Sequence, residues 1–268
     1  MAVLGDKATA ESVANLQRQL GLDRPLIVQF GWFVERFFRG DLGMSIIQGI
    51  PVLKLIAERM PVTIFLTIYA PVLSLMLAVP LAFISAANRG GPADYVIRTI
   101  FQIGLSSPVF YIGLLLLIVF SGYLRWFPVG GMGDSFGENL YYLFLPALTL
   151  AFHQAAVLMR NLRSAIIDAL TAEHVDFATS KGLRRRTVIV SHVLRNSMVS
   201  TVTLFGLNIG WLISGAVVTE TVYSIPGAGR LMVDAIYARD YPVVQALTLL
   251  FTILAYLAKR QIWSRIEH

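Results

Sequence analysis

The chain has 268 residues, of which 56% are hydrophobic and only 14% are charged, and its mean hydropathy is +0.67. Soluble globular domains carry about 25% charged residues, so this composition excludes an ordinary soluble domain. A net charge of +6 can indicate nucleic-acid binding, but here the basic residues are distributed among alternate loops, and we expect no nucleic-acid partner. The absence of cysteine excludes disulfides and thiolate metal sites.

The N-terminal segment, positions 1–60, contains no signal-peptide core and no apolar span. We predict a short amphipathic helix over residues 9–20 and a second helix from Pro25 to Gly40. The aromatic residues of the second helix suit a membrane–water interface and equally suit a small packed cap. Residues 51–60 are predicted to form an interfacial helix that leads into the first span at Pro61, and we expect residues 1–60 to be extracytoplasmic.

Five long uncharged blocks follow. A helix needs roughly 20 apolar residues to cross the hydrocarbon core, and four blocks exceed that length while the last is short. The sequence therefore predicts an all-α polytopic membrane protein with about five transmembrane helices in a domain over residues 61–258. The predicted spans are 61–88, 99–124, 139–159, 196–219 and 241–258.

Lys and Arg concentrate in alternate loops between these spans. Two lie in the 89–98 loop, seven in the 160–195 loop and three after Ala258, whereas the other loops hold only one and two. Because positive loops stay in the cytoplasm, we expect a multi-pass plasma-membrane (inner-membrane) protein with a cytoplasmic C-terminal tail at 259–268.

The 160–195 loop is longer than a connector requires. Thr171 is suited to cap a short helix with Glu173 and Asp176 near its positive end, and Gly182 suits a helix stop after Lys181. The pattern predicts a helix–turn–helix element that lies along the membrane and projects an exposed tip. The alternative is a solvated positive loop that contacts anionic lipid headgroups.

This loop resembles the "EAA" loop of ABC-importer permeases. The resemblance rests on Asp176-Phe177-Ala178-x-x-x-Gly182 and on His192-x-Leu194-Arg195, and it extends through FATSKGLRRRTVIVSHVLRN and ETVYSIPGAGRL to most of residues 10–250. The most similar members are dipeptide and oligopeptide permeases. The resemblance implies an ATPase-coupling loop at 160–195 whose docking residues are Glu173, Asp176, Ala178, Lys181, Gly182 and Arg184.

The same resemblance implies the fold and the partners. The fold is that of a type I ABC-importer permease, working by alternating access with a second permease, two cytoplasmic ATPases and an extracytoplasmic binding protein. No G-x-x-x-x-G-K-[ST] motif is present, so ATP and Mg are expected on the partner ATPase, and the chain itself is expected to be no enzyme and to hold no cofactor. Nickel or glutathione import within the family, a secondary transporter and a membrane-embedded enzyme are the alternatives.

Other polar residues are candidates for substrate or partner contact. His153 and Asn208 lie within spans, where polar groups mark a translocation pathway or simply join helices by hydrogen bonds. Asp234, Arg239 and Asp240 are predicted either to contact the binding protein or to pair among themselves. Four scattered histidines show no zinc-type spacing, so we expect no metal site.

Both ends depart from the family pattern. Members begin with one further span, which we expect to be encoded upstream of Met1, and they end differently from the sequence after Phe251. The last block, at 1.5 Å per residue, is about 27 Å long and just short of the roughly 30 Å core. We therefore expect Met1 to be an internal start and the tail to be aberrant.

Overall fold

The computed structural model describes residues 25–170 and 209–266, which are almost entirely helical. Within these ranges there is no β-strand, only an isolated antiparallel bridge between Met44 and Pro51. The helices are α2 (Leu26–Phe38), α3 (Val52–Ala87), α4 (Pro92–Ser106), α5 (Val109–Leu116), the π-helix η2 (Leu117–Tyr123), α6 (Phe136–Tyr142), α7 (Phe144–Leu170), α11 (Ile209–Val222), α12 (Ala228–Ala238) and α13 (Tyr241–Ile266).

Two helices are long and apolar enough to cross a membrane without a break, namely α3 and the Tyr241–Ala258 part of α13. Two bent pairs also qualify if each is counted as one span: α4 with α5 and η2, and α6 with α7. The described residues thus hold two to four candidate spans, and the all-α membrane architecture expected from composition is present.

Helix α3 differs from the predicted boundary at Pro61. The sequence predicts an interfacial helix over 51–60 and a separate span from Pro61, but the structure has one 36-residue helix that passes through Pro61, Pro71 and Pro80. Its length is about 54 Å at 1.5 Å per residue, well beyond the roughly 30 Å hydrocarbon core. Membrane helices accommodate internal proline because neighbouring groups satisfy the freed carbonyls.

The predicted 99–124 span is divided at Pro108. Helices α4 and α5 meet there at an angle of 114°. Ser107, immediately before the proline, has the extended conformation (φ −93°, ψ 137°), because the proline ring disfavours the helical conformation of the preceding residue. An apolar run of sufficient length is therefore not one straight helix here.

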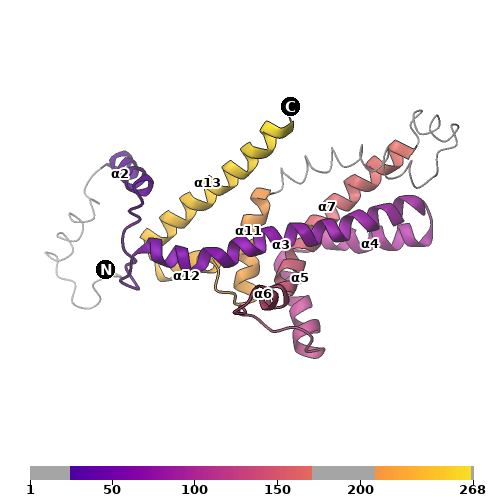
Figure 1. The fold of residues 1–268 in the computed structure, drawn as a ribbon, viewed down its shortest axis with the longest axis horizontal. Helices are drawn as coiled ribbons and strands as arrows, with labels where there is room; N and C mark the ends of the chain where they lie inside the picture. Colours follow the sequence, from indigo (N-terminus) through magenta and orange to yellow (C-terminus); the bar gives the residue numbers. More distant parts are fainter. Residues whose placement is uncertain (1–24, 171–208, 267–268) are drawn as a thin grey trace.

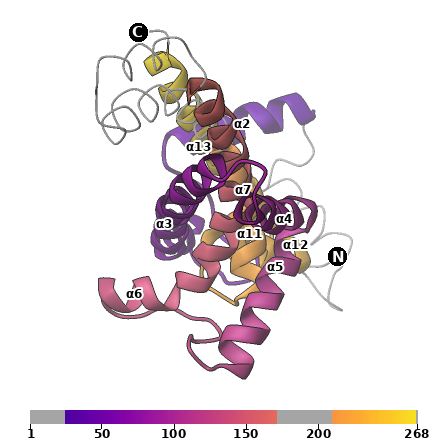
Figure 2. The ribbon, with the colours of Figure 1, turned by 90° about the vertical axis from the view of Figure 1, so that its right-hand side faces the viewer.

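The centre of the molecule is the packing of α3 against α7, with α4 beside them (Figure 1). Buried alanines, among them Ala78, Ala82, Ala155 and Ala156, let the α3 and α7 backbones approach closely. A second cluster joins α3 and α7 to α11, and a third joins the start of α3 to α12 and α13. In both views α5 and α6 project from one side and the C-terminal part of α13 from the other (Figures 1 and 2).

Candidate functional site

One polar network joins α3, α4 and α7 at the far end of α3. The Arg163 guanidinium donates from Nε to Asp94 Oδ1 (2.8 Å) and from Nη2 to Asp94 Oδ2 (2.7 Å). The Ser85 hydroxyl donates to Asp94 Oδ1 (2.5 Å), and the Gly90 amide donates to Asp94 Oδ2 (3.0 Å). The Asp94 side chain is 2% exposed and that of Arg163 is 17% exposed, so the acid is buried and the base is partly buried.

The charge state of this network follows from its hydrogen bonds. Asp94 lies in the first turn of α4, before the uncharged block that begins at Thr99. The two short hydrogen bonds from the Arg163 guanidinium to the two Asp94 oxygens have the geometry of a bidentate ion pair between a carboxylate and a guanidinium.

A second polar network lies in the N-terminal part of α3, about a third of the way along the helix, and joins it to α11 and α12. The Glu220 carboxylate is fully buried and accepts a hydrogen bond from the Thr63 hydroxyl (2.7 Å) and one from the Arg230 amide (3.0 Å). The Thr63 hydroxyl in turn accepts a hydrogen bond from the Ala228 amide (2.9 Å). Thr63 and Glu220 thus satisfy first-turn amides of α12 that have no intrahelical partner.

Two glycines leave room for this network. A β-carbon at Gly227 would collide with the Glu220 carboxylate, and one at Gly229 would lie 2.6 Å from the Val217 α-carbon on α11. The Gly227-Ala228-Gly229 sequence is therefore a site of close packing between α11 and the start of α12.

The two networks are separated along α3 by about the thickness of a membrane core. Thr63 lies about a third of the way along this helix and Ser85 near its end. At a rise of 1.5 Å per residue they are about 33 Å apart along the helix axis, close to the roughly 30 Å thickness of the hydrocarbon core. One continuous helix therefore connects the two polar networks.

The three residues predicted to contact a binding protein have different environments. Asp234 and Arg239 are exposed, and Asp234 forms a long ion pair with Arg230 (3.8 Å). Asp240 is only 3% exposed and accepts hydrogen bonds from the Ser45 hydroxyl and the Ile46 amide (3.2 Å). Asp240 therefore anchors the segment before α3 rather than presenting its charge to a partner in this conformation.

The predicted pathway residue His153 lies on α7 and stacks on Trp211 of α11, with ring centroids 4.3 Å apart. Within the described ranges, His153 Nδ1 and both polar atoms of the neighbouring Gln154 are buried without a hydrogen-bond partner. Unpaired polar groups are unfavourable in an apolar interior. His153 and Gln154 are thus buried polar residues of α7 with hydrogen-bonding capacity that no described protein group uses at these three atoms.

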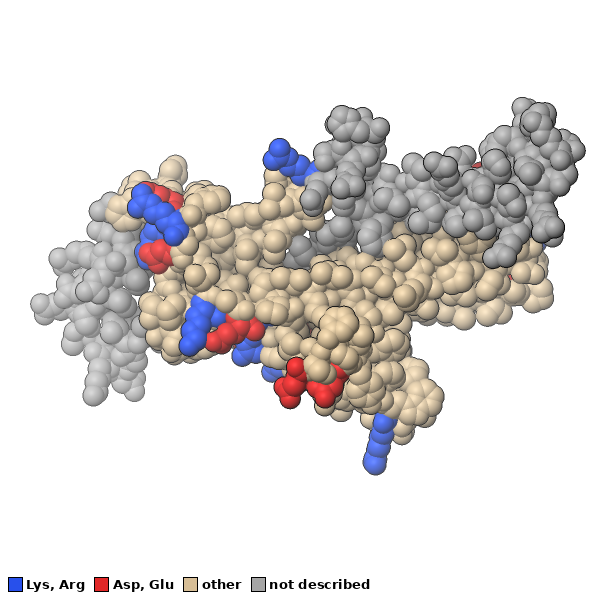
Figure 3. Space-filling view, in the orientation of Figure 1, with Lys and Arg blue, Asp and Glu red and all other residues tan. Residues whose placement is uncertain are grey.

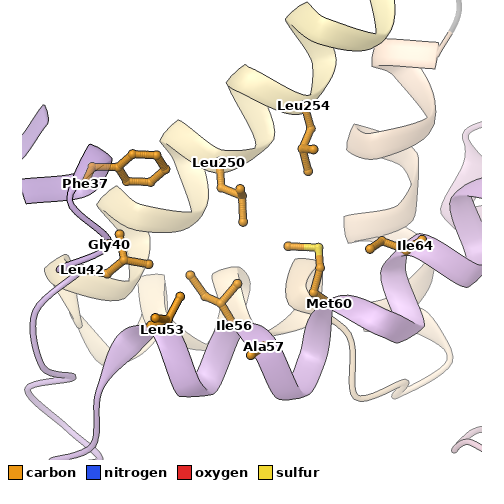
Figure 4. A pocket seen from close by; sticks show the side chains of 10 residues that line it. All are labelled: Phe37, Gly40, Leu42, Leu53, Ile56, Ala57, Met60, Ile64, Leu250 and Leu254. Carbon is orange, nitrogen blue, oxygen red and sulfur yellow. The ribbon is translucent and has the colours of Figure 1, made fainter.

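An apolar pocket of about 340 Å³ opens between α3, α13 and the segment after α2 (Figure 4). Its walls are aliphatic and aromatic: Phe37, Gly40, Leu42, Leu53, Ile56, Ala57, Met60, Ile64, Leu250 and Leu254. A lining of this kind can hold a hydrocarbon group but provides no side-chain partner for a charged or hydrogen-bonding solute.

Several predicted site residues lie outside the described residues. They are the pathway residue Asn208 and the loop residues Glu173, Asp176, Ala178, Lys181, Gly182 and Arg184. The helix that leads to the loop is described: α7 continues past Arg163 to Leu170.

The sequence analysis did not identify the residues of the two networks. Asp94 is the single acidic residue in the basic 89–98 loop, and Glu220 follows directly on the uncharged block 196–219. An isolated acidic residue beside an apolar block was the sequence feature that could have indicated each network. The partners of these two acids lie 69 and 157 residues away, and no local periodicity indicates them.

Comparison with known proteins gives a consistent assignment. The profile of the family described as "Binding-protein-dependent transport system inner membrane component" matches residues 78–259. A probable peptide ABC transporter permease protein of Sinorhizobium fredii is 36% identical over 93% of this chain and 81% of its own length. A glutathione transport system permease protein of Escherichia coli K12 is 38% identical over 94% of this chain and 80% of its own length.

Solved structures agree in fold. An inward-facing structure of the MetNI methionine ABC transporter has a TM-score of 0.66 at 14% identity, covering 80% of this chain and 95% of that chain. A crystal structure of an amino acid ABC transporter with histidines has a TM-score of 0.61 at 13% identity, covering 80% and 94%. At such identities the likeness concerns the fold alone.

Proposed function

The chain belongs to the family of binding-protein-dependent transport system inner membrane components, the permease subunits of ABC importers, and we propose on that basis that it imports short peptides. Membership in this family replaces the secondary transporter considered from the sequence. The permease forms the membrane part of an ATP-driven importer.

The observation that supports a peptide substrate is the pair of similar relatives. One is named for peptides and the other for glutathione, which is itself a tripeptide. The shared chemistry is a short chain with amide groups and charged ends. Nickel, the other alternative within the family, has no such support from these two relatives.

We orient the chain by the charge of its loops. The Asp94–Arg163 network is placed on the cytoplasmic side, because Asp94 belongs to the basic 89–98 loop and Arg163 to the basic 160–195 loop. The Thr63–Glu220 network then lies on the outer side with α12, about 33 Å away along α3. The C-terminal end of α13 would be cytoplasmic.

The partners in this proposal are a second permease, two cytoplasmic ATPases and an outer binding protein. ATP and Mg would bind to the ATPases and not to this chain. Closure of the ATPases would displace the 171–182 element, and rocking of the spans would open the pathway past His153 and Gln154 toward the binding protein. The exposed Asp234 and Arg239 are suited to contact that binding protein.

Uptake by the complete complex tests the substrate. The chain would be produced with its second permease, ATPases and binding protein in proteoliposomes, and uptake of labelled dipeptide, tripeptide, glutathione and Ni²⁺ would be measured with internal and external ATP. We expect ATP-dependent uptake of at least one short peptide. Uptake of Ni²⁺ alone, with no peptide imported, would contradict the proposed substrate.

A further inference from the structure

The Asp94–Arg163 pair differs from the other ion pairs of the described residues. Those of α2 and α12 join residues four or five positions apart and are largely exposed. The Asp94–Arg163 pair joins residues 69 positions apart and is buried. Exposed pairs contribute little to stability, whereas a buried bidentate pair restricts the geometry of the helices that carry it.

Stability alone does not account for charges at this position. Desolvation of a buried ion pair offsets much of its attraction, and apolar residues of similar volume often serve a fold equally well. What the ion pair adds is a dependence on the relative position of the two helices. The two parallel hydrogen bonds from the Arg163 guanidinium to the Asp94 carboxylate weaken when their distance or angle changes, so they favour one relative position of the two helices.

The neighbouring contact between α3 and α7 is apolar. Small side chains such as Ala78 and Ala155 lie in it beside larger ones such as Leu158 and Leu162, and apolar contacts of this kind are not directional. The polar network adds three fixed points to this contact: Ser85 at the end of α3, Gly90 in the turn and Asp94 at the start of α4. Ser85 and Gly90 donate hydrogen bonds to the Asp94 carboxylate, and Asp94 in turn accepts those from Arg163.

Arg163 lies within the 160–195 loop, ahead of the 171–182 element that the proposed function assigns to ATPase docking. Leu170, the last described residue before that element, lies two helical turns beyond Arg163, a distance of about 10 Å along the helix. Arg163 therefore lies nearer to the docking element than the buried alanines Ala155 and Ala156 do.

We propose that the Asp94–Arg163 pair is the mechanical joint that makes α3, α4 and α7 move as one body when the ATPase displaces the end of α7. Arg163 and Asp94 are thus positioning residues for transport, with no contact to the solute. This inference rests on the proposed function, because it assigns a role in coupling ATP hydrolysis to import.

Two substitutions and a matched control test the joint by transport. Arg163→Lys keeps the compensating charge for Asp94 but loses the two-point geometry, and Arg163→Gln removes the charge. Arg160→Gln removes an exposed charge one turn earlier on α7. We expect the Lys variant to assemble and to hydrolyse ATP at the wild-type rate. The number of peptides imported per ATP should fall at least about 5-fold, which corresponds to a loss of about 1 kcal/mol of coupling free energy.

We expect Arg163→Gln to be impaired at least as strongly and Arg160→Gln to match wild type. Wild-type numbers of peptides per ATP in both Arg163 variants would overturn the joint while leaving the proposed function intact. No uptake of any peptide by wild type would count against the proposed substrate instead.

A distance measurement tests the joint without reference to the substrate. The cysteine-free chain allows spin labels at Val96→Cys on α4 and Ser164→Cys on α7, both exposed positions. In the complete complex, trapping the ATPases with vanadate should leave the inter-label distance unchanged, and Arg163→Lys should shift or broaden it. A shift of the distance in the otherwise wild-type chain would overturn the proposal, because the two helices would then move independently.

Discussion

The Thr63 hydroxyl on α3 donates a hydrogen bond to the Glu220 carboxylate on α11, 2.7 Å away and 157 residues later in the chain. The same hydroxyl accepts the Ala228 amide at the start of α12. Three helices therefore meet at one oxygen atom. In Figure 3 the charged side chains in view form small separate groups on a surface made mostly of other residues, whereas Glu220 is fully buried.

Thr63→Val should destabilise the protein, because it leaves the Ala228 amide and one Glu220 oxygen buried without a partner. Each unsatisfied group costs about 1–3 kcal/mol. Thr67→Val is the matched control, since its hydroxyl donates only to the Thr63 carbonyl within the same helix. Thermal unfolding in detergent should show a lower midpoint for Thr63→Val, and equal midpoints for the two variants would contradict the importance of this contact.

Gly229→Ala should be more damaging than its size suggests. Its β-carbon would lie 2.6 Å from the Val217 α-carbon, and this backbone atom has no rotamer through which to move away. Gly137→Ala on α6 meets nothing within 4 Å and should be neutral or stabilising by up to about 1 kcal/mol. The yield of folded protein after detergent extraction compares them; full recovery of Gly229→Ala would show that α11 and α12 can separate.

Substitutions at Asp234, Arg239 and Asp240 distinguish residues that contact the binding protein from residues that stabilise the fold. Asp234→Lys and Arg239→Glu alter exposed charges, so we expect slower, salt-sensitive association with the binding protein and an unchanged melting temperature. Asp240→Asn weakens the buried bonds to Ser45 and Ile46 and should lower the melting temperature. Unaltered binding-protein association after both reversals would remove Asp234 and Arg239 from the docking surface.

Gly182→Leu should uncouple ATP hydrolysis from import. The sequence predicts a helix stop at Gly182, and a branched side chain opposes the left-handed turn expected there, which would displace the docking tip. The measurement is ATP hydrolysis and peptide uptake by the same reconstituted complex. Normal stimulation of hydrolysis together with normal uptake would contradict docking through residues 171–183.

Single-cysteine labelling tests the orientation. Ser224 is exposed in the loop between α11 and α12, so Ser224→Cys should react with an impermeant thiol reagent in intact cells. Ser180→Cys in the predicted coupling loop should react only after the membrane is opened. The reverse pattern would mean that the charge-based orientation, and the placement of both polar networks with it, is inverted.

Local sequence was sufficient for the class of protein and for its family. The long uncharged apolar blocks predict membrane helices because each residue contributes its own transfer energy, independently of distant contacts. The loop motif ending in Gly182 indicated the family in the same local way, and the family profile confirms it. Helix boundaries were harder to predict from the sequence, because proline did not have the same effect at each position. Helix α3 continues through Pro61, whereas the 99–124 block bends at Pro108.

Only the tertiary structure decided which polar residues act together. Asp94 with Arg163, Glu220 with Thr63 and Asp240 with Ser45 are separated by 69, 157 and 195 residues. Asp234 and Asp240 look alike in the sequence, yet one is exposed and the other is buried beneath the segment before α3. Hydropathy and spacing report how a residue relates to its own helix, but the energy of a buried charge depends on the partner that the fold brings to it.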